Sequence, residues 1–291
     1  MPAYARIAAI HLQAHRLDSA RATLNAGLVL TRAQQRTHPE AHLQLIGLEG
    51  WYYAETDQPE QSVRVAREIL ALHHRTNAPL ADVALAERIL GSQCLAVGDF
   101  DCATDALTAS LGHYRRVFGP DNRYTALVLG HLAETHAFSG RDALADTTFR
   151  HALAMKQRYF GPADAELGYT LHAYGRHAHA QGRVLEADTL LAGAERIWAQ
   201  ARAPGDGRLL ITRATRALVR HDLGDRRAAA DTLEAIWRRA GGGRRDRSWA
   251  VLALAFSELR RRQGRAAEAD SILREATPLL RRSPFRRVAG G

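Results

Sequence analysis

Apolar and polar residues follow the period of an α-helix along most of this chain, and glycine interrupts the pattern at regular intervals. Ala, Leu, Arg and Glu dominate and β-branched residues rarely alternate with polar ones, so the pattern predicts helices and disfavours strands. The stretch RVFGPDNRYTALVLGHLAETHAFSG ends at Gly140, and 42 residues later RYFGPADAELGYTLHAYGRHAHAQG ends at Gly182. A fixed period of this length predicts stacked copies of one supersecondary unit.

The glycines predict a turn inside each copy. Gly98, Gly140, Gly182 and Gly224 are spaced 42 residues apart, and Gly264 follows 40 residues later. Each lies between two helical patterns, where glycine can adopt the left-handed conformation that ends a helix. The FGP triplet ends the second helix of a copy, because proline cannot continue it. With 14 residues before each turn, the repeats start near Met1, Leu43, Ala84, Ala126, Gly168, Leu210 and Ala250.

Three positions of the repeat keep their character in the copies. The eighth is small in all seven: Ala8, Gly50, Gly91, Ala133, Gly175, Ala217 and Ser257. The twentieth is also small: Ala20, Ser62, Ala103, Ala145, Ala187, Ala229 and Ala269. The twenty-fourth is apolar: Leu24, Ala66, Leu107, Phe149, Leu191, Leu233 and Leu273. Helices approach closely only where no bulky side chain separates them, so each repeat is predicted to be a tight helix pair.

This pattern resembles the tetratricopeptide repeat over about residues 1–282, and its 42-residue period with FGPD resembles the kinesin-light-chain subclass, which also occurs in bacterial signalling proteins. The resemblance implies an all-α solenoid of about seven helix pairs wound as a right-handed superhelix. Residues 283–291 are predicted to be a disordered basic tail. Arg213 and Arg216 stand at expected core positions of repeat six, where the register can slip by one residue.

In this family, positions two, five, nine and twelve of the first helix line a concave groove. Spacings of three, four and three residues keep these positions on one helical face. The predicted groove residues are Trp51, Arg88, Glu134, Tyr169, His172, Arg176, His179, His221, Glu258 and Arg261. An aromatic and basic stripe suits a peptide that carries carboxylates or phosphates. The alternative is an ordinary solvated face that contains histidines.

The histidines add a conditional hypothesis about pH. If His172, His179 and His221 share the groove, its affinity for an acidic ligand would rise as the pH falls from about 7.5 to 6, where histidine titrates.

The net charge of +9 is unevenly distributed, since residues 196–291 carry 22 arginines against 10 acidic residues. A basic segment can attract nucleic acid, but few aromatic residues are interleaved with these arginines. Lys156 is the only lysine, and arginine occurs wherever a solvated helix needs a cation, which suggests codon bias. Nucleic-acid binding is therefore disfavoured.

No motif predicts catalysis, a cofactor or a metal. His131 and His136 in HLAETH are five residues apart, whereas zinc-binding helices place two histidines four apart on one face. GGGRR at Gly241 follows no strand and precedes no GK[ST], and GxSxG and GxGxxG are absent from the sequence. Cys94 and Cys102 are interpreted as buried thiols in a reducing cytoplasm, with redox pairing as the alternative.

The sequence thus predicts a non-catalytic cytoplasmic scaffold that holds a protein or peptide, with acidic peptides among the candidates, and no membrane segment. The alternative is a regulatory or sensor module of a larger signalling protein, such as a kinase or transcription regulator. That alternative rests on Met1, which falls at the start of a first helix without the polar capping unit that a solenoid needs. The partner and the oligomeric state stay open.

Overall fold

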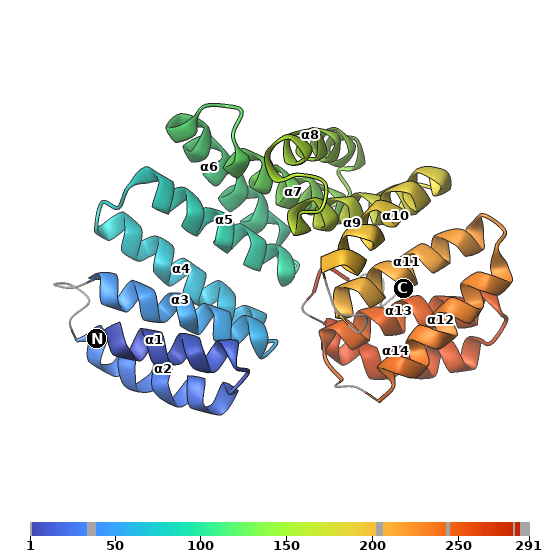
Figure 1. The fold of residues 1–291 in the computed structure, drawn as a ribbon, viewed down its shortest axis with the longest axis horizontal. Coiled ribbons are helices and arrows are strands. Elements are labelled where there is room, and N and C mark those ends of the chain that lie inside the picture. The colour runs from blue at the N-terminus through green and yellow to red at the C-terminus, as the bar shows by residue number, and fades with distance from the viewer. Residues whose placement is uncertain (1, 34–38, 202–205, 243–244, 282, 286–291) are drawn as a thin grey trace. The chain divides into compact units, whose positions relative to one another are not determined.

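The computed structural model describes residues 2–33, 39–201, 206–242, 245–281 and 283–285 (Figure 1). These residues form fourteen α-helices and no strand. The chain divides into two compact parts, here called the N-terminal body (Met1–Pro120) and the C-terminal body (Asp121–Gly291). The all-α fold of seven helix pairs is as predicted, with three pairs in the N-terminal body and four in the C-terminal body.

Each pair consists of a first helix, A, and a second helix, B. The A helices are α1 (Pro2–Gln13), α3 (Pro39–Glu55), α5 (Leu80–Ala96), α7 (Arg123–Phe138), α9 (Ala165–Ala180), α11 (Gly207–Asp222) and α13 (Arg247–Arg262). The B helices are α2 (Leu17–Arg32), α4 (Pro59–Arg75), α6 (Phe100–Phe118), α8 (Asp142–Phe160), α10 (Val184–Ala201), α12 (Arg226–Ala240) and α14 (Ala266–Leu280). None of these helices is both long enough and apolar enough to cross a membrane.

The turn between the two helices of a pair has the predicted left-handed backbone. The φ angles of Gly98, Gly140, Gly182, Gly224 and Gly264 lie between 73° and 99°. In the first two pairs the left-handed residues are His15 and Asp57, at 50° and 53°. Glycine reaches this conformation without the steric cost that a side chain adds, which explains its recurrence in five of the seven turns.

The small columns lie where A and B helices meet, as predicted. A Cβ atom added to Gly91 would lie 2.5 Å from Cγ of Leu107, and one added to Gly175 would lie 2.7 Å from Cγ of Leu191. In these two repeats the leucine at the twenty-fourth position therefore fills the space beside the glycine at the eighth position. The alanines of the twentieth column are at most 3% exposed.

The A helices of repeats two to seven begin three or four residues before the predicted repeat starts. In the last four repeats a side chain caps this extra turn. The Oδ1 of Asn122 accepts hydrogen bonds from the backbone N–H groups of Tyr124 and Thr125, at 2.9 Å each. Asp164, Asp206 and Asp246 cap α9, α11 and α13 in the same way.

Helices of each body pack in chain order, and neighbouring A helices also touch. In the N-terminal body α1 contacts α3, and in the C-terminal body α7 contacts α9, α9 contacts α11 and α11 contacts α13. Figure 1 shows α7, α9, α11 and α13 following one another through the C-terminal body. A continuous A-helix surface therefore runs along that body.

Repeat six keeps its register despite its arginines. Helix α11 starts and ends 42 residues after α9, so no slip occurs. The Nε of Arg213 donates to Glu195 on α10 at 2.9 Å, and the Nε of Arg216 donates to Asp188 at 2.8 Å. Carboxylates on the preceding helix thus neutralise cations at the expected core positions.

The only lysine of the chain, Lys156 on α8, is 2% exposed. Its Nζ donates to the side chain of Glu166 at 3.0 Å and to the backbone carbonyl of Glu166 at 3.1 Å. A Cβ atom added to Gly130 of α7 would lie 3.0 Å from this Nζ, so the glycine at this position leaves room for the ammonium group. The ion pair joins α8 to the start of α9.

Part of the expected disordered tail has an ordered position. Ser283 is fully buried, and its Oγ donates to the carbonyl of Leu280 at 2.9 Å. The backbone N–H of Phe285 donates back to this Oγ at 3.2 Å. The chain therefore turns at the end of α14 and returns toward the body. The rest of the predicted tail, residues 286–291, lies outside the described residues.

Candidate functional site

A groove in the C-terminal body follows its A helices and has a volume of about 450 Å³. We call it the A-helix groove. Side chains from α7, α9, α11 and α13 line it, together with Leu273 of α14 and Phe285. The principal lining residues are Phe138, Arg176, His177, His179, Thr215, Leu218, Val251, Leu254, Glu258, Arg261 and Arg262.

Part of the groove lining is apolar. Phe138, Leu218, Val251 and Leu254 line it, and each is only partly buried. When another apolar group covers a solvent-exposed apolar side chain, the covered surface leaves water, and this transfer is favourable. An elongated apolar surface with charged groups beside it can therefore accept a chain segment.

Arg176 lies on one side of this surface, held by Glu134 and by an aromatic ring. Its Nη2 donates to Oε1 of Glu134 at 2.9 Å, and its guanidinium carbon lies 4.2 Å from the centre of the Phe138 ring. Burial lowers the pKa of Arg176, which the Glu134 carboxylate partly opposes. The Nε of Arg176 is buried with no hydrogen-bond partner among the described residues.

A second charged group centres on Asp222 at the end of α11. The Nε2 of His179 lies 2.7 Å from Oδ2 of Asp222, and Arg262 of α13 donates to the same carboxylate. Burial by itself would raise the pKa of Asp222, but His179 and Arg262 lower it below its ordinary value. Glu258 accepts from the Nε of Arg262 at 2.9 Å. These contacts join α9, α11 and α13 beside the groove.

The structure brings four of the ten predicted groove residues into the lining of the A-helix groove: Arg176, His179, Glu258 and Arg261. Two others contact residues that line the groove or pair with its lining. Glu134 holds Arg176, and Nδ1 of His221 lies 3.8 Å from Asp222 and 3.4 Å from Nη1 of Arg262.

The other four predicted residues have different surroundings. Tyr169 is 38% exposed and meets Trp198 of α10 edge-on, with ring centres 4.7 Å apart. His172 makes a 3.0 Å hydrogen bond with Thr212. Trp51 and Arg88 belong to the N-terminal body, where the indole of Trp51 donates to Glu55 at 3.0 Å. Of the eight predicted residues in the C-terminal body, Tyr169 and His172 are therefore not among those that line the A-helix groove.

The hypothesis of a histidine-dependent groove is wrong for His172. Burial, with a smaller contribution from the Arg176 charge, lowers the pKa of His172 to about 3. The imidazole is therefore neutral between pH 7.5 and 6, and it cannot attract an acidic ligand in that range. For His179 and His221 the hypothesis stays a prediction.

The sequence stripe missed the apolar part of the groove. Phe138, Leu218 and Leu254 read as ordinary core residues of amphipathic helices, because a one-dimensional pattern does not separate full burial from partial burial. The spacing on α13 could have indicated Leu254 as a groove residue, since it lies one helical turn before the predicted groove residue Glu258. Phe285 had no such signal, because its position depends on the turn at Ser283.

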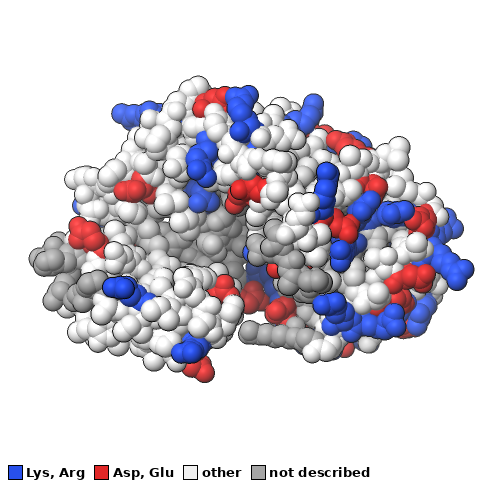
Figure 2. All heavy atoms as spheres, in the orientation of Figure 1, with Lys and Arg blue, Asp and Glu red and all other residues white. Residues whose placement is uncertain are grey.

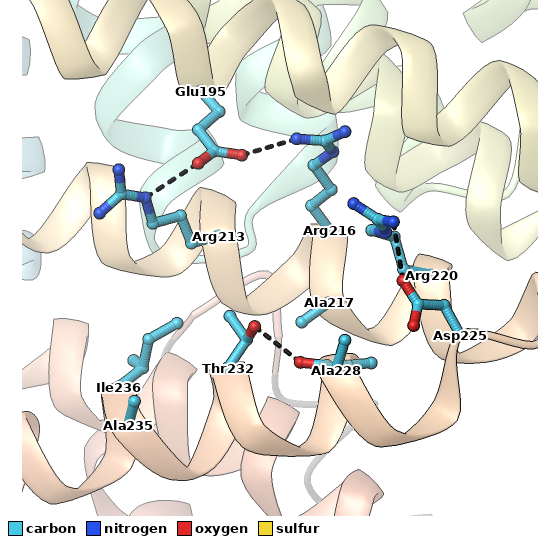
Figure 3. Close-up of a pocket in the computed structure, with 11 residues that line it drawn as sticks. Glu195, Arg213, Arg216, Ala217, Arg220, Asp225, Ala228, Thr232, Ala235 and Ile236 are labelled. Carbon is cyan, nitrogen blue, oxygen red and sulfur yellow. Dashed lines mark hydrogen bonds and ion pairs between the residues drawn. The ribbon is translucent and has the colours of Figure 1, made fainter.

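A cavity of about 460 Å³ opens between α11 and α12, with Glu195 of α10 beside it (Figure 3). Three arginines line it, and each is already paired. Glu195 lies between Arg213 and Arg216 and accepts from both, and Arg220 donates to Asp225 at 2.7 Å. An anion would have to displace these carboxylates, so the A-helix groove is the stronger candidate.

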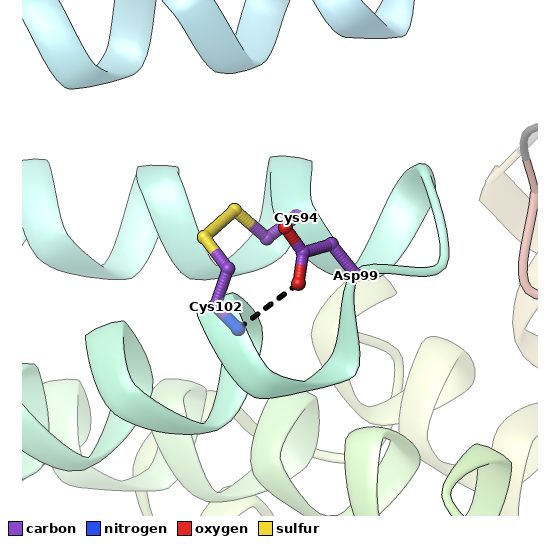
Figure 4. A group of neighbouring side chains, drawn as sticks. All are labelled: Cys94, Asp99 and Cys102. Carbon is purple, nitrogen blue, oxygen red and sulfur yellow. Dashed lines mark hydrogen bonds between the residues drawn. A yellow bond between two sulfur atoms is a disulfide. The ribbon is translucent and has the colours of Figure 1, made fainter.

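Cys94 of α5 and Cys102 of α6 form a disulfide across the Gly98 turn (Figure 4). The interpretation of both as free thiols is therefore wrong, and the pairing alternative holds. Within the described part of the chain, the only three-residue group with metal-ligand geometry is Cys94, Asp99 and Cys102. Its two sulfur atoms are bonded to each other, and Asp99 accepts the backbone N–H of Cys102 at 3.2 Å. The disulfide is unexpected in a reducing compartment, and the cytoplasmic location stays a prediction.

The basic residues of the C-terminal body are interspersed with carboxylates. On the face shown in Figure 2, red acidic groups lie among the blue arginines. Arg260 donates to Glu234, Arg262 to Glu258 and Asp222, and Arg265 to Glu268. Ion pairing of this kind weakens the case for a nucleic-acid footprint.

Comparison with known proteins places the fold. The model of the tetratricopeptide repeat family matches residues 82–158. No curated protein matches the chain. Among solved structures, a kinesin light chain from Podosopora anserina with nearly identical TPR-like repeats is 15% identical, with a TM-score of 0.56, over 69% of this chain and 95% of that one.

Two further solved structures share the fold. Apo NprR, a quorum sensor from B. thuringiensis, has a TM-score of 0.65 at 15% identity, over 96% of this chain and 75% of NprR. A Rap protein in complex with competence and sporulation factor has a TM-score of 0.66 at 11% identity, over 93% and 77% of the two chains. These identities establish the fold and nothing more. Residues 82–158 therefore match the tetratricopeptide-repeat family, and the described chain has the same helix-pair fold as these solved structures.

Proposed function

We propose that this chain is a non-catalytic binding protein that holds a peptide, or an extended segment of a partner protein, in the A-helix groove. The observation that carries the proposal is the groove itself, in which partly exposed apolar side chains of α7, α11 and α13 adjoin partly exposed ion pairs that involve α9 and α13. Because the ion pairs already hold the charged side chains in place, a ligand would not have to order these side chains when it binds.

The charges favour a ligand with a carboxylate. Arg261 is exposed, and its Nη2 reaches Asp270 only at 3.6 Å, which is a weak surface pair. Arg176 and Arg262, in contrast, are bound to acidic side chains. A ligand carboxylate beside Arg261 would gain a bidentate partner at little cost.

The structural neighbours support the same proposal by analogy. NprR was crystallised in complex with its cognate peptide NprX, and the Rap protein with competence and sporulation factor. At identities of 11–15% these complexes say what the fold can do and not what this chain binds.

The test is selection from a displayed library of random twelve-residue peptides on the full chain. Enriched peptides are then measured on three proteins: wild type, Leu254→Ser and Leu185→Ala. Leu254 lines the groove, whereas Leu185 is 75% exposed on α10 and serves as the matched control. We expect a loss of at least tenfold in affinity for the first variant and none for the second, because an apolar anchor contact contributes about 1.5 kcal/mol or more.

Two outcomes would contradict the proposal. Peptides that bind wild type and Leu254→Ser equally would place binding elsewhere on the chain. Failure to enrich any peptide would argue against peptide binding altogether. An Arg261→Ala variant tests the charge separately, since it should weaken peptides with an acidic residue and leave neutral ones unchanged.

A regulatory role within a larger signalling protein is the second candidate. The observation that favours it is the match with NprR, in which a quarter of the quorum sensor lies outside the aligned region. A defined peptide that changes the activity of an attached effector domain would support this role.

A further inference from the structure

Phe285 occupies one part of the A-helix groove. The turn at Ser283 directs the chain from the end of α14 back toward the A helices, where Phe285 is among the residues that line the groove. Its side chain is only partly buried. The ring belongs to the chain, yet it lies on the surface that we propose for a ligand.

Two side chains receive the ring. Phe285 meets Phe138 edge-on, with ring centres 5.4 Å apart and ring planes at 90°. The guanidinium carbon of Arg176 lies 4.8 Å from the centre of Phe285 and 4.2 Å from the centre of Phe138. Edge-on aromatic pairs and cations near ring faces both attract an aromatic ring more strongly than an aliphatic side chain.

The receiving groups are held without Phe285. Glu134 fixes Arg176, and Phe138 ends α7 beside it. The subsite therefore belongs to α7 and α9, whereas its occupant arrives from a segment more than 100 residues away in sequence. A site held by one part of the chain and filled by another can exchange its occupant.

From this geometry we infer that Phe138 and Arg176 form an aromatic subsite of the A-helix groove, and that Phe285 is its resident occupant. The inference rests on the proposed function, because it states which side chain a bound peptide presents. A Phe, Tyr or Trp of the partner takes the place of Phe285, and the Ser283 turn opens as it enters. Only chains whose subsite is empty can bind the partner. The apparent affinity for the partner is therefore the intrinsic affinity multiplied by the fraction of chains with an empty subsite.

The first measurement needs no ligand. In a chain with isotope-labelled phenylalanine rings, assigned with the Phe138→Leu and Phe285→Ala variants, a nuclear Overhauser effect should connect the rings of Phe138 and Phe285. Its absence would overturn the inference, because the ring would then not reside in the subsite.

The second measurement tests exchange with a defined probe, a synthetic peptide of residues 281–291. Phe285→Ala should shift the Phe138 ring resonance, and the peptide should restore it. The same peptide with Ala in place of Phe should not. Wild type should require at least about fivefold more peptide, because its subsite is mostly filled and a tethered occupant acts at a local concentration of about a millimolar.

Two results would overturn the inference. One is that wild type and Phe285→Ala need the same peptide concentration to shift the Phe138 ring resonance. The other is that the resonance of the variant does not shift up to about 5 mM peptide, which is well above the local concentration of the tethered ring. These results are separable from failure of the proposed function. If residues 281–291 bind in exchange but the peptide library yields no groove-dependent sequence, the resident occupant stands and the proposed ligand class falls.

Discussion

The close contact between a glycine of the A helix and a leucine of the B helix determines how tightly these pairs pack. Gly91 and Gly175 have no side chain because Leu107 and Leu191 occupy that volume. The small columns were readable from sequence since they recur in all seven repeats. The twenty-fourth position was recognised as apolar, but the sequence did not show that its side chain fills the gap beside the eighth.

Replacing Gly91 by alanine should destabilise the protein. The new Cβ would lie 2.5 Å from Cγ of buried Leu107, and overpacking of this kind costs about 1–3 kcal/mol. Gly112 on α6 has nothing within 4 Å, so Gly112→Ala should stabilise the helix by about 0.5–1 kcal/mol. Urea unfolding of both variants measures the difference. Equal effects of the same sign would contradict this account of the helix contact.

His172 should make the protein less stable in acid. Its pKa is about 3 in the folded chain and about 6.5 when unfolded, so between these values the unfolded state binds a proton that the folded state does not. The contribution of His172 to the free energy of unfolding is therefore retained above pH 6.5 and lost progressively as the pH falls toward 3. His172→Gln lacks this group and should lose less stability between pH 7 and 5. Parallel profiles in urea unfolding would show that the folded imidazole titrates normally.

At the scale of helices, the sequence predicted the turns better than the helix starts. The turn glycines are determined by backbone conformation, whereas the A helices begin a turn earlier than the apolar columns indicate. The missing signal was the capping residue, since Asn122, Asp164 and Asp206 recur at 42-residue spacing. The Cys94–Cys102 disulfide was misjudged for a different reason: two cysteines eight residues apart can pair only if the turn between them brings their helices together.

Loss of that disulfide should weaken the α5–α6 pair. Closing so short a loop restricts the unfolded chain by about 2–3 kcal/mol, and the stabilisation is smaller where local structure already brings the two residues together. A reducing agent should therefore lower the unfolding midpoint of wild type. The Cys94→Ala, Cys102→Ala double variant should start lower and show no response to the reductant. A midpoint of wild type that is insensitive to reduction would contradict a stabilising disulfide.

For the whole molecule, the candidate site is more local than the repeat pattern implied. The pattern treats all seven repeats alike and distributed its groove residues from Trp51 to Arg261. In contrast, every described residue that lines the A-helix groove belongs to the C-terminal body. Sequence periodicity gives the face of each helix but not the depth between neighbouring helices, which depends on side-chain packing in three dimensions.

A fragment of residues 121–291 should therefore fold alone and keep the groove. Its four helix pairs have their own buried core, and in repeat proteins stability is mainly a sum over neighbouring units. Circular dichroism should show a helical, cooperatively unfolding fragment. Its affinity for a library-selected peptide should lie within about twofold of the full chain, as expected when no contact is lost. A fragment that folds but loses affinity would assign part of the site to the N-terminal body.

The burial of Lys156 gives the surface an unusual chemical character. Lys156 is the only lysine of the sequence, so its ammonium group is the only one on a side chain. That group is bound to Glu166 and occupies the space that Gly130 leaves by having no side chain. Acylating reagents and enzymes that conjugate ubiquitin or acetyl groups to lysine need an exposed, deprotonated amine. The exposed basic side chains among the described residues are arginines and histidines, so this part of the surface presents positive charge without lysine nucleophilicity.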